Sequence, residues 1–291
     1  MKKVLTIIVI TLSIQFCKGP GELGGQLFND NRAVFKNFID EVWQKYGYNK
    51  APSSVEEVYV FDFDHTIANT ETLIPVTTTD GTTDRRDSKC FVITKGEKAD
   101  FSVFTEKNLK KTDIIGLSEK LLKKLDKDTS WVIVVTARSQ EHTFTSALKY
   151  LKDKGLPVDG VLAVNSKLLR ENLWGKLQMP ELTEQIPRGF KKALLISALL
   201  EHAKAQGASV KTVKYYEDTD KHITGYINVL PNTFPEIRSE VFDLVRSGKP
   251  NKRKYQSRFL GYGLNKVFYS QAGFELKDLK TYSSRDCAVN R

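Results

Sequence analysis

The sequence predicts an α/β fold built on a mostly parallel β-sheet, and two observations lead to this prediction. Residues 131–135 are consecutive apolar residues without alternation, which is typical of a strand buried on both faces. Runs of this kind alternate along the 291-residue chain with segments whose apolar residues recur at helical spacing. Such an order favours a three-layer, Rossmann-like core in which helices cover both faces of the sheet.

Five segments are expected to be strands of this sheet. Each is a short, mainly apolar run bounded by turn residues or charged residues. In chain order they are 58–61, 131–135, 160–164, 210–216 and 226–230. Polar side chains directly follow several of these runs, and two carboxylates follow the first one.

Five further segments are expected to be helices. In chain order they are 29–46, 113–127, 139–154, 188–206 and 236–245. Gly47, Gly155 and Gly207 end three of them, as glycine often does because it adopts the left-handed conformation that closes a helix. Residues 166–187 are expected to form a long connection.

A small β-rich cap is predicted over residues 68–112, inserted directly after the first strand. This segment is rich in threonine and in turn residues. Asp80 and Gly81 lie between threonine-rich flanks, and residues 95–97 separate two apolar runs. Both patterns predict hairpins.

Composition and charge limit the classes of function. The chain is 40% hydrophobic and 27% charged, as expected of a globular protein with one sizeable core and a smaller appendage. Its net charge of +10 favours anionic partners such as phosphates, nucleic acid or acidic lipid. The three cysteines lack metal-ligand spacing and the four histidines are scattered, which argues against a His/Cys zinc site.

The first 21 residues are interpreted as a secretory signal peptide. Lys2 and Lys3 precede an apolar run over residues 4–14, which is too short to span a bilayer as a helix. We therefore expect an exported protein, secreted or periplasmic, without stable membrane insertion after cleavage. Lipid modification of Cys17 is a variant of this interpretation. If the segment is not a signal, it is an N-terminal strand of a cytoplasmic protein or an uncleaved anchor. In an oxidising compartment, Cys90 and Cys287 are candidates for a disulfide.

Polar side chains at three strand ends form the candidate site. They are Asp62 and Asp64 after the first strand, Thr136 and Arg138 after the second, and Glu217 and Asp218 after the fourth. Because ligands bind beyond the carboxyl ends of parallel strands, these groups are expected to converge at one edge. Carboxylates in such proximity repel each other unless a cation neutralises them. Oxygen ligands without histidine or cysteine favour Mg²⁺, and a phosphate ester is the natural substrate.

A lysine is expected to complete this site. The helix predicted over 188–206 presents an apolar face made of Leu194, Leu195, Ala198 and Leu199. At about 100° per residue, Lys191 falls near the centre of that face and Lys192 well away from it. Lys191 is therefore the predicted site cation; alternatively, it extends to solvent.

Four stretches together resemble the haloacid dehalogenase superfamily of phosphohydrolases. DFDHT and VVTAR look like its first two motifs, Lys191 stands where its third-motif lysine is expected, and YYEDTDKHI looks like the acidic fourth motif. The resemblance covers about residues 58–246. The spacing is also similar to that of the Swiss-army-knife subgroup, which is proposed to act in RNA repair.

The resemblance implies a role for each residue. Asp62 would be the nucleophile that forms an aspartyl-phosphate, and Asp64 the acid and then the base. Thr136 and Lys191 would bind the phosphoryl group, and Arg138 would contact the substrate or pair with a carboxylate. The Mg²⁺ ligands would be Asp62, the main-chain carbonyl of Asp64, Asp218 and, directly or through water, Glu217.

The predicted function is a Mg²⁺-dependent phosphomonoesterase. Its substrate would be a nucleotide, a small phosphorylated metabolite or a nucleic-acid end. The alternative is an exported, catalytically silent binding protein on the same fold, and transfer of the phosphoryl group to an acceptor other than water is a third reading.

The predicted domain organisation follows from these elements. A signal peptide over 1–21 and a helical segment over 22–56 precede a catalytic domain over 57–247, which contains the cap. A basic, aromatic tail over 248–291 follows. The tail either packs against the core, which we favour, or tracks a nucleic-acid backbone.

Overall fold

The computed structural model of the protein describes residues 20–51, 53–70, 72–87, 93–109, 112–177, 188–246 and 262–270. Outside these residues lie residues 1–19 of the predicted signal peptide, all three cysteines and most of the predicted tail. Within them, no helix is long and apolar enough to cross a membrane.

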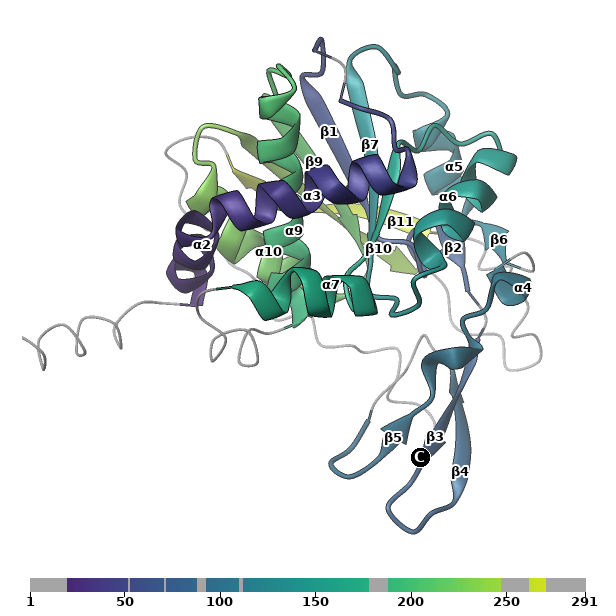
Figure 1. Ribbon diagram of the computed structural model, residues 1–291. Coiled ribbons are helices and arrows are strands. Elements are labelled where there is room, and N and C mark those ends of the chain that lie inside the picture. Colours follow the sequence, from purple (N-terminus) through teal and green to yellow (C-terminus); the bar gives the residue numbers. More distant parts are fainter. Residues whose placement is uncertain are drawn as a thin grey trace, which may run out of the picture.

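A six-stranded sheet forms the centre of the fold (Figure 1). Its order is β11-β10-β9-β1-β7-β8, and all neighbours pair in parallel except β10 and β11. The strands are β1 (Glu57–Phe61), β7 (Ser130–Thr136), β8 (Gly160–Ala163), β9 (Thr212–Glu217), β10 (Arg238–Arg246) and β11 (Tyr262–Ser270). Five parallel strands confirm the predicted α/β class.

Helices cover this sheet, and they complete the predicted layered core. They are α2 (Pro20–Asp30), α3 (Arg32–Tyr46), α5 (Gly116–Leu122), α6 (Thr143–Asp153), α7 (Lys167–Asn172), α9 (Arg188–Ala205) and α10 (Asp220–Thr233), with the 3₁₀ turn η3 (Trp174–Lys176). Helix α9 contacts α3, α10 and β7, so it is enclosed on several sides. Every residue of β7 is buried, as the unbroken apolar run predicted.

Two predicted elements near the end of the domain are wrong. Residues 226–230, predicted as a strand, belong to α10 because Ile223, Tyr226, Ile227 and Leu230 are buried at helical spacing. Residues 236–245, predicted as a helix, contain most of β10, which pairs with β9. There Ser239, Glu240 and Val241 are consecutive buried residues, as in a strand covered on both faces. The predicted tail also contains β11, which pairs with β10.

The insertion after β1 forms small antiparallel sheets that fit the predicted cap. Strands β3 (Leu73–Thr77), β4 (Thr83–Asp87) and β5 (Lys98–Ala99) form one sheet, and β2 (Ala68–Asn69) pairs with β6 (Asp113–Ile114). A 3₁₀ turn, η2 (Phe101–Val103), and a short helix, α4 (Glu106–Leu109), follow β5. Figure 1 shows the three-stranded sheet projecting from the core as a separate lobe.

The cap has its own apolar cluster. Ile74, Val76 and Phe104 are buried together, with Ala99, Phe101 and Val103 packed against them. The first predicted hairpin is present, since β3 and β4 are joined by a turn in which Gly81 has a φ of 85°. The second predicted turn contains Gly96, with a φ of 92°, and leads into β5. Its preceding residues, 88–92, lie outside the described part of the chain.

Candidate active site

The parallel register of the sheet places the ends of three strands side by side. Phe61 of β1 lies opposite Val134 of β7 and Tyr216 of β9. The residues just beyond these positions therefore meet at the carboxyl edge. The Asp62 amide extends the ladder by donating to the Tyr216 carbonyl over 2.9 Å, which fixes the direction in which Asp62 leaves the strand.

Three predicted carboxylates converge at this edge. One oxygen each from Asp62, Glu217 and Asp218 lies within 4.8 Å of the others. Glu217 is fully buried, Asp62 nearly so, and Asp218 is half-buried. Three acidic groups with oxygen donors at this spacing could hold a metal ion.

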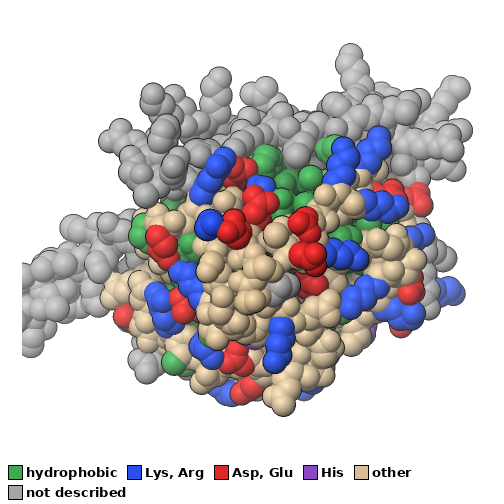
Figure 2. Space-filling view, turned by 90° about the horizontal axis from the view of Figure 1, so that it is seen from above, with side chains coloured by type: hydrophobic (Ala, Val, Ile, Leu, Met, Phe, Trp, Pro, Cys, Tyr) green, Lys and Arg blue, Asp and Glu red, His purple; other side chains and the backbone are tan. Residues whose placement is uncertain are grey.

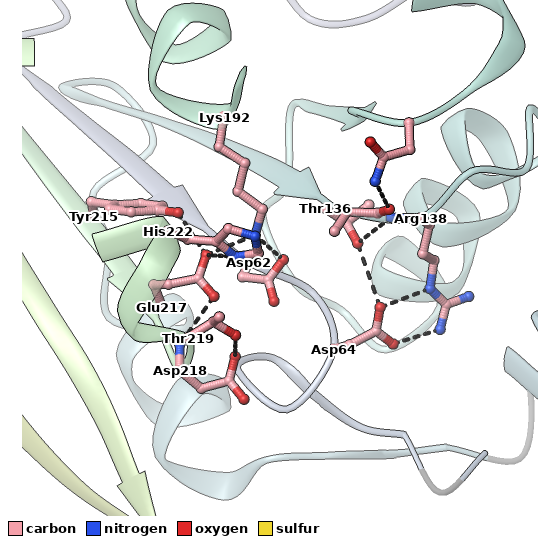
Figure 3. Close-up of polar contacts among 12 residues, drawn as sticks. Asp62, Asp64, Thr136, Arg138, Lys192, Tyr215, Glu217, Asp218, Thr219 and His222 are labelled. Carbon is pink, nitrogen blue, oxygen red and sulfur yellow. Dashed lines mark hydrogen bonds and ion pairs between the residues drawn. The ribbon is translucent and has the colours of Figure 1, made fainter. Parts of the chain in front are cut away.

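The cation of this acidic group is Lys192, not Lys191. The Lys192 Nζ lies 2.6 Å from Asp62 Oδ1 and 2.7 Å from Glu217 Oε2, and its side chain is 1% exposed (Figure 3). The Lys191 ammonium lies instead 5.5 Å from the centre of the Trp174 ring. The prediction of Lys191 as the site cation is therefore wrong.

The error has a physical cause in the burial of α9. Most side chains from Ala193 to Leu200 are fully buried, so the helix has no single apolar face from which to read a direction. Lys192 aligns with Leu195, Ile196 and Leu199, at the third, fourth and seventh positions after it, and these too are buried.

Helices α9 and α10 pack closely at two glycines, and this packing places side chains of both helices beside Glu217. A Cβ at Gly189 would lie 1.9 Å from the Lys221 carbonyl oxygen, and one at Gly225 would lie 2.3 Å from the Gly189 carbonyl carbon. The first two turns of α10 therefore touch the start of α9 backbone to backbone. As a result, Lys192 from one helix and His222 from the other reach the same carboxylate.

Glu217 accepts hydrogen bonds from α9, from β9 and from the residue that follows β9. Its Oε2 accepts from Lys192 and, over 2.6 Å, from the Tyr215 hydroxyl, and it lies 3.2 Å from His222 Nδ1. Its Oε1 accepts from the Asp218 amide over 3.2 Å. These groups orient Glu217 toward Lys192 and leave the half-buried Asp218 at the outer side of the acidic group (Figure 3).

The charges of this cluster are unevenly balanced. Burial and the nearby Glu217 carboxylate raise the pKa of Asp62 to about 7, although Lys192 opposes them. Burial also acts against ionised Glu217, but Lys192 and His222 more than offset it and lower the pKa of Glu217. Burial and Lys192 lower the pKa of His222, which favours a neutral ring. Burial and Glu217 therefore disfavour the ionised form of Asp62, and a cation bound beside it would favour that form.

Asp64 belongs to a second polar group beside the first. Arg138 donates to both carboxylate oxygens, from Nη2 over 2.7 Å and from Nε over 3.0 Å. Thr70 donates over 2.7 Å and the Thr136 hydroxyl lies 3.5 Å away. Burial opposes ionisation, but the Arg138 guanidinium holds the pKa of Asp64 at about 2.

Asp62 directly follows the first strand, whereas Asp64 lies in the turn that comes after it. The amides of Ile67 and Ala68 both donate to the Phe63 carbonyl, so the chain reverses after Asp62. His65 lies within this turn with a φ of 63°, a conformation that costs a side-chain-bearing residue about 1 kcal/mol. Asp62 therefore faces Lys192 while Asp64 faces Arg138 (Figure 3).

Sequence reasoning found most of this site but not all of it. Asp62, Glu217 and Asp218 meet as expected, and Asp64, Thr136 and Arg138 form the adjoining group. Tyr215 was missed. It lies two residues before Glu217 in a strand, so both side chains point to the same side, and this spacing was a usable signal.

The opposite edge of the sheet carries a different feature. A hollow of about 310 Å³ lies near the start of β7, with Ser130, Val132, Lys152 and Asp159 among its lining residues. It is remote from the acidic group, which follows the ends of the strands.

In Figure 2, the view from above Figure 1, positive and negative side chains are intermixed.

Comparisons of the chain with protein-family models, with curated proteins and with solved structures found no match.

The Tyr215 hydroxyl offers a direct test of how Glu217 is held. Tyr215→Phe is expected to lower the free energy of unfolding by about 1.5–3 kcal/mol, because it removes a hydrogen bond to a buried charged group. Urea denaturation measures this. Tyr226→Phe is the matched control, since the Tyr226 ring stacks on Tyr215 at 4.6 Å but its hydroxyl meets the neutral Ser239. An equal or larger loss in the control would contradict the expectation.

Proposed function

We propose that this protein is a Mg²⁺-dependent phosphomonoesterase that acts through an aspartyl-phosphate on Asp62. The arrangement around Asp62 carries the proposal. One of its oxygens is held by Lys192, and the same carboxylate belongs to the acidic group with Glu217 and Asp218. Such an arrangement shields a carboxylate from the negative charge of an approaching phosphate and aligns it for attack.

The donor set fits Mg²⁺. The ligand atoms are carboxylate oxygens, which hard divalent cations prefer, and they carry more negative charge than Lys192 neutralises. Asp62 and Asp218 would hold the ion, with Glu217 nearby. A bound Mg²⁺ would neutralise these carboxylates and bind a phosphate oxygen of the substrate.

Each residue of the site would then have its own role in the reaction. An Asp62 oxygen bonds to phosphorus as the bond to the leaving alcohol breaks, and Lys192 stabilises the charge on the phosphoryl oxygens. Thr136 would donate a hydrogen bond to the same group. Water then attacks the aspartyl-phosphate, and Asp64 takes its proton.

Arg138 controls the protonation state of Asp64, and so its role in the reaction. The ion pair keeps Asp64 ionised, which is the form that accepts a proton from water. As the acid for the leaving alcohol, Asp64 would first have to gain a proton, which it can do once the substrate phosphate has drawn Arg138 away from it. A contact between Arg138 and the substrate would favour that exchange.

The substrate class remains the one proposed from sequence: a nucleotide, a small phosphorylated metabolite or a nucleic-acid end. The net charge of +10 supports an anionic ligand of this kind. Export of the protein follows the signal-peptide interpretation of residues 1–21. N-terminal sequencing of the mature chain would test whether residues 1–21 are removed.

Phosphate release from p-nitrophenyl phosphate tests the activity. We expect release with Mg²⁺, loss of activity with EDTA, and a loss of at least about 1000-fold in Asp62→Asn. A panel of nucleotides and of oligonucleotides with 3′- or 5′-phosphates would follow. Equal inactivity of the native protein and Asp62→Asn on the whole panel would favour the catalytically silent binding protein instead. Formation of a new phosphate ester with an added alcohol would reveal phosphotransfer.

A further inference from the structure

We infer that Phe104 of the cap is a positioning residue for Asp64 and that it acts through Arg138. This inference rests on the proposed function for its consequence in catalysis. Its structural basis is the packing of the Arg138 guanidinium, whose side chain is only 4% exposed. The Arg138 Cζ lies 4.9 Å from the centre of the Phe63 ring and 4.8 Å from that of Phe104.

The two rings come from different parts of the fold. Phe63 lies between the two aspartates, in the turn that follows β1. Phe104 follows η2 and is part of the apolar cluster of the cap, with Ile74 and Val76. The guanidinium is therefore held partly by the core and partly by the inserted lobe. Aromatic rings attract a buried guanidinium and also restrict its orientation.

The orientation of Arg138 sets that of Asp64. The bidentate pair uses the planar, fixed geometry of the guanidinium, so rotation of this plane would break one or both hydrogen bonds. Asp64 also accepts from Thr70, at the start of the insertion. Side chains from both ends of the insertion thus bear on the position of this carboxylate.

Further contacts tie the same turn of the cap to the loop after β7. Gln140 Nε2 donates to the Phe101 carbonyl over 2.5 Å, and His142 Nε2 lies 3.1 Å from the Phe104 carbonyl. Arg138, Gln140 and His142 are alternate residues of one short segment. Docking of the cap and alignment of Asp64 are therefore expected to be one coupled event rather than two independent ones.

Kinetics of Phe104→Leu test the coupling in catalysis. We expect kcat for phosphate release to fall about tenfold, with KM and the half-saturating Mg²⁺ concentration within about twofold, because the loss falls on alignment rather than binding. In an Arg138→Lys background, Phe104→Leu is expected to have no further effect. Ile74→Val is the control, because it trims a buried side chain of the same cluster without removing a ring from Arg138. A similar loss in Ile74→Val, or effects of Phe104→Leu and Arg138→Lys that multiply, would overturn the inference.

Hydrogen exchange separates this inference from the proposed function, because it requires no activity. We expect Arg138→Lys to raise amide exchange in residues 101–109 at least about tenfold, and Phe104→Leu to do the same in residues 65–70. If the native protein is inactive on all substrates but these reciprocal changes occur, the coupling stands and the phosphatase proposal fails. If neither segment responds to the change in the other, the coupling is refuted even in an active enzyme.

Discussion

Lys192→Met is expected to destabilise the protein by about 3–5 kcal/mol and to lower phosphate release at least about 1000-fold. Removal of the ammonium group leaves the Asp62 and Glu217 carboxylates buried without the cation that lies within 2.7 Å of both. It also removes the group that would stabilise the phosphoryl oxygens. The two losses should therefore appear together.

Lys191→Met is the matched control for this substitution. The Lys191 ammonium packs on the Trp174 ring, an interaction worth about 0.5–1 kcal/mol at a partly exposed site. Urea denaturation and p-nitrophenyl phosphate turnover of the two variants measure the difference. If Lys191→Met were the more damaging of the two, the assignment of Lys192 to the site would be wrong.

Asp62→Asn is expected to abolish activity and, in the absence of Mg²⁺, to make the protein more stable. Burial and Glu217 raise the pKa of Asp62 from 3.8 to about 7, so ionised Asp62 is disfavoured in the folded state. A neutral amide avoids this cost and still offers an oxygen to Lys192. Active-site residues of this kind commonly reduce stability for the sake of function.

The effect of pH follows from the same shift. Because the folded pKa is raised, the folded state binds more protons than the unfolded state between pH 4 and about 7. The contribution of Asp62 to stability therefore falls as pH rises through this window and stays low above it. In EDTA, the advantage of Asp62→Asn should grow from near zero at pH 4 to about 2–4 kcal/mol at pH 8.

Thermal or urea unfolding of both proteins at several pH values measures this difference. Added Mg²⁺ provides the control, because an ion bound at Asp62 and Asp218 would stabilise the native protein and reduce the advantage of the variant. A difference that is constant with pH would show that the pKa of Asp62 is not raised in the folded state.

Local patterns were enough to predict four of the six strands of the sheet and the three carboxylates at its edge. The apolar run that became β7 is recognisable without any neighbour, because a strand buried on both faces has no polar positions. The position of Asp62 and Glu217 then follows from parallel strands ending together. The same reasoning failed for residues 226–230, where a short apolar run fits a strand and a buried helix equally well.

The sequence by itself thus determined the α/β class and the convergence of Asp62, Glu217 and Asp218, since both depend on period and strand order. Only the tertiary structure decided that Lys192, rather than Lys191, meets these carboxylates. It alone joined His222 to Glu217 and Phe104 to Arg138. These pairings depend on which face of an enclosed helix meets the sheet and on where the inserted lobe packs, and both are set by contacts between residues distant in the chain.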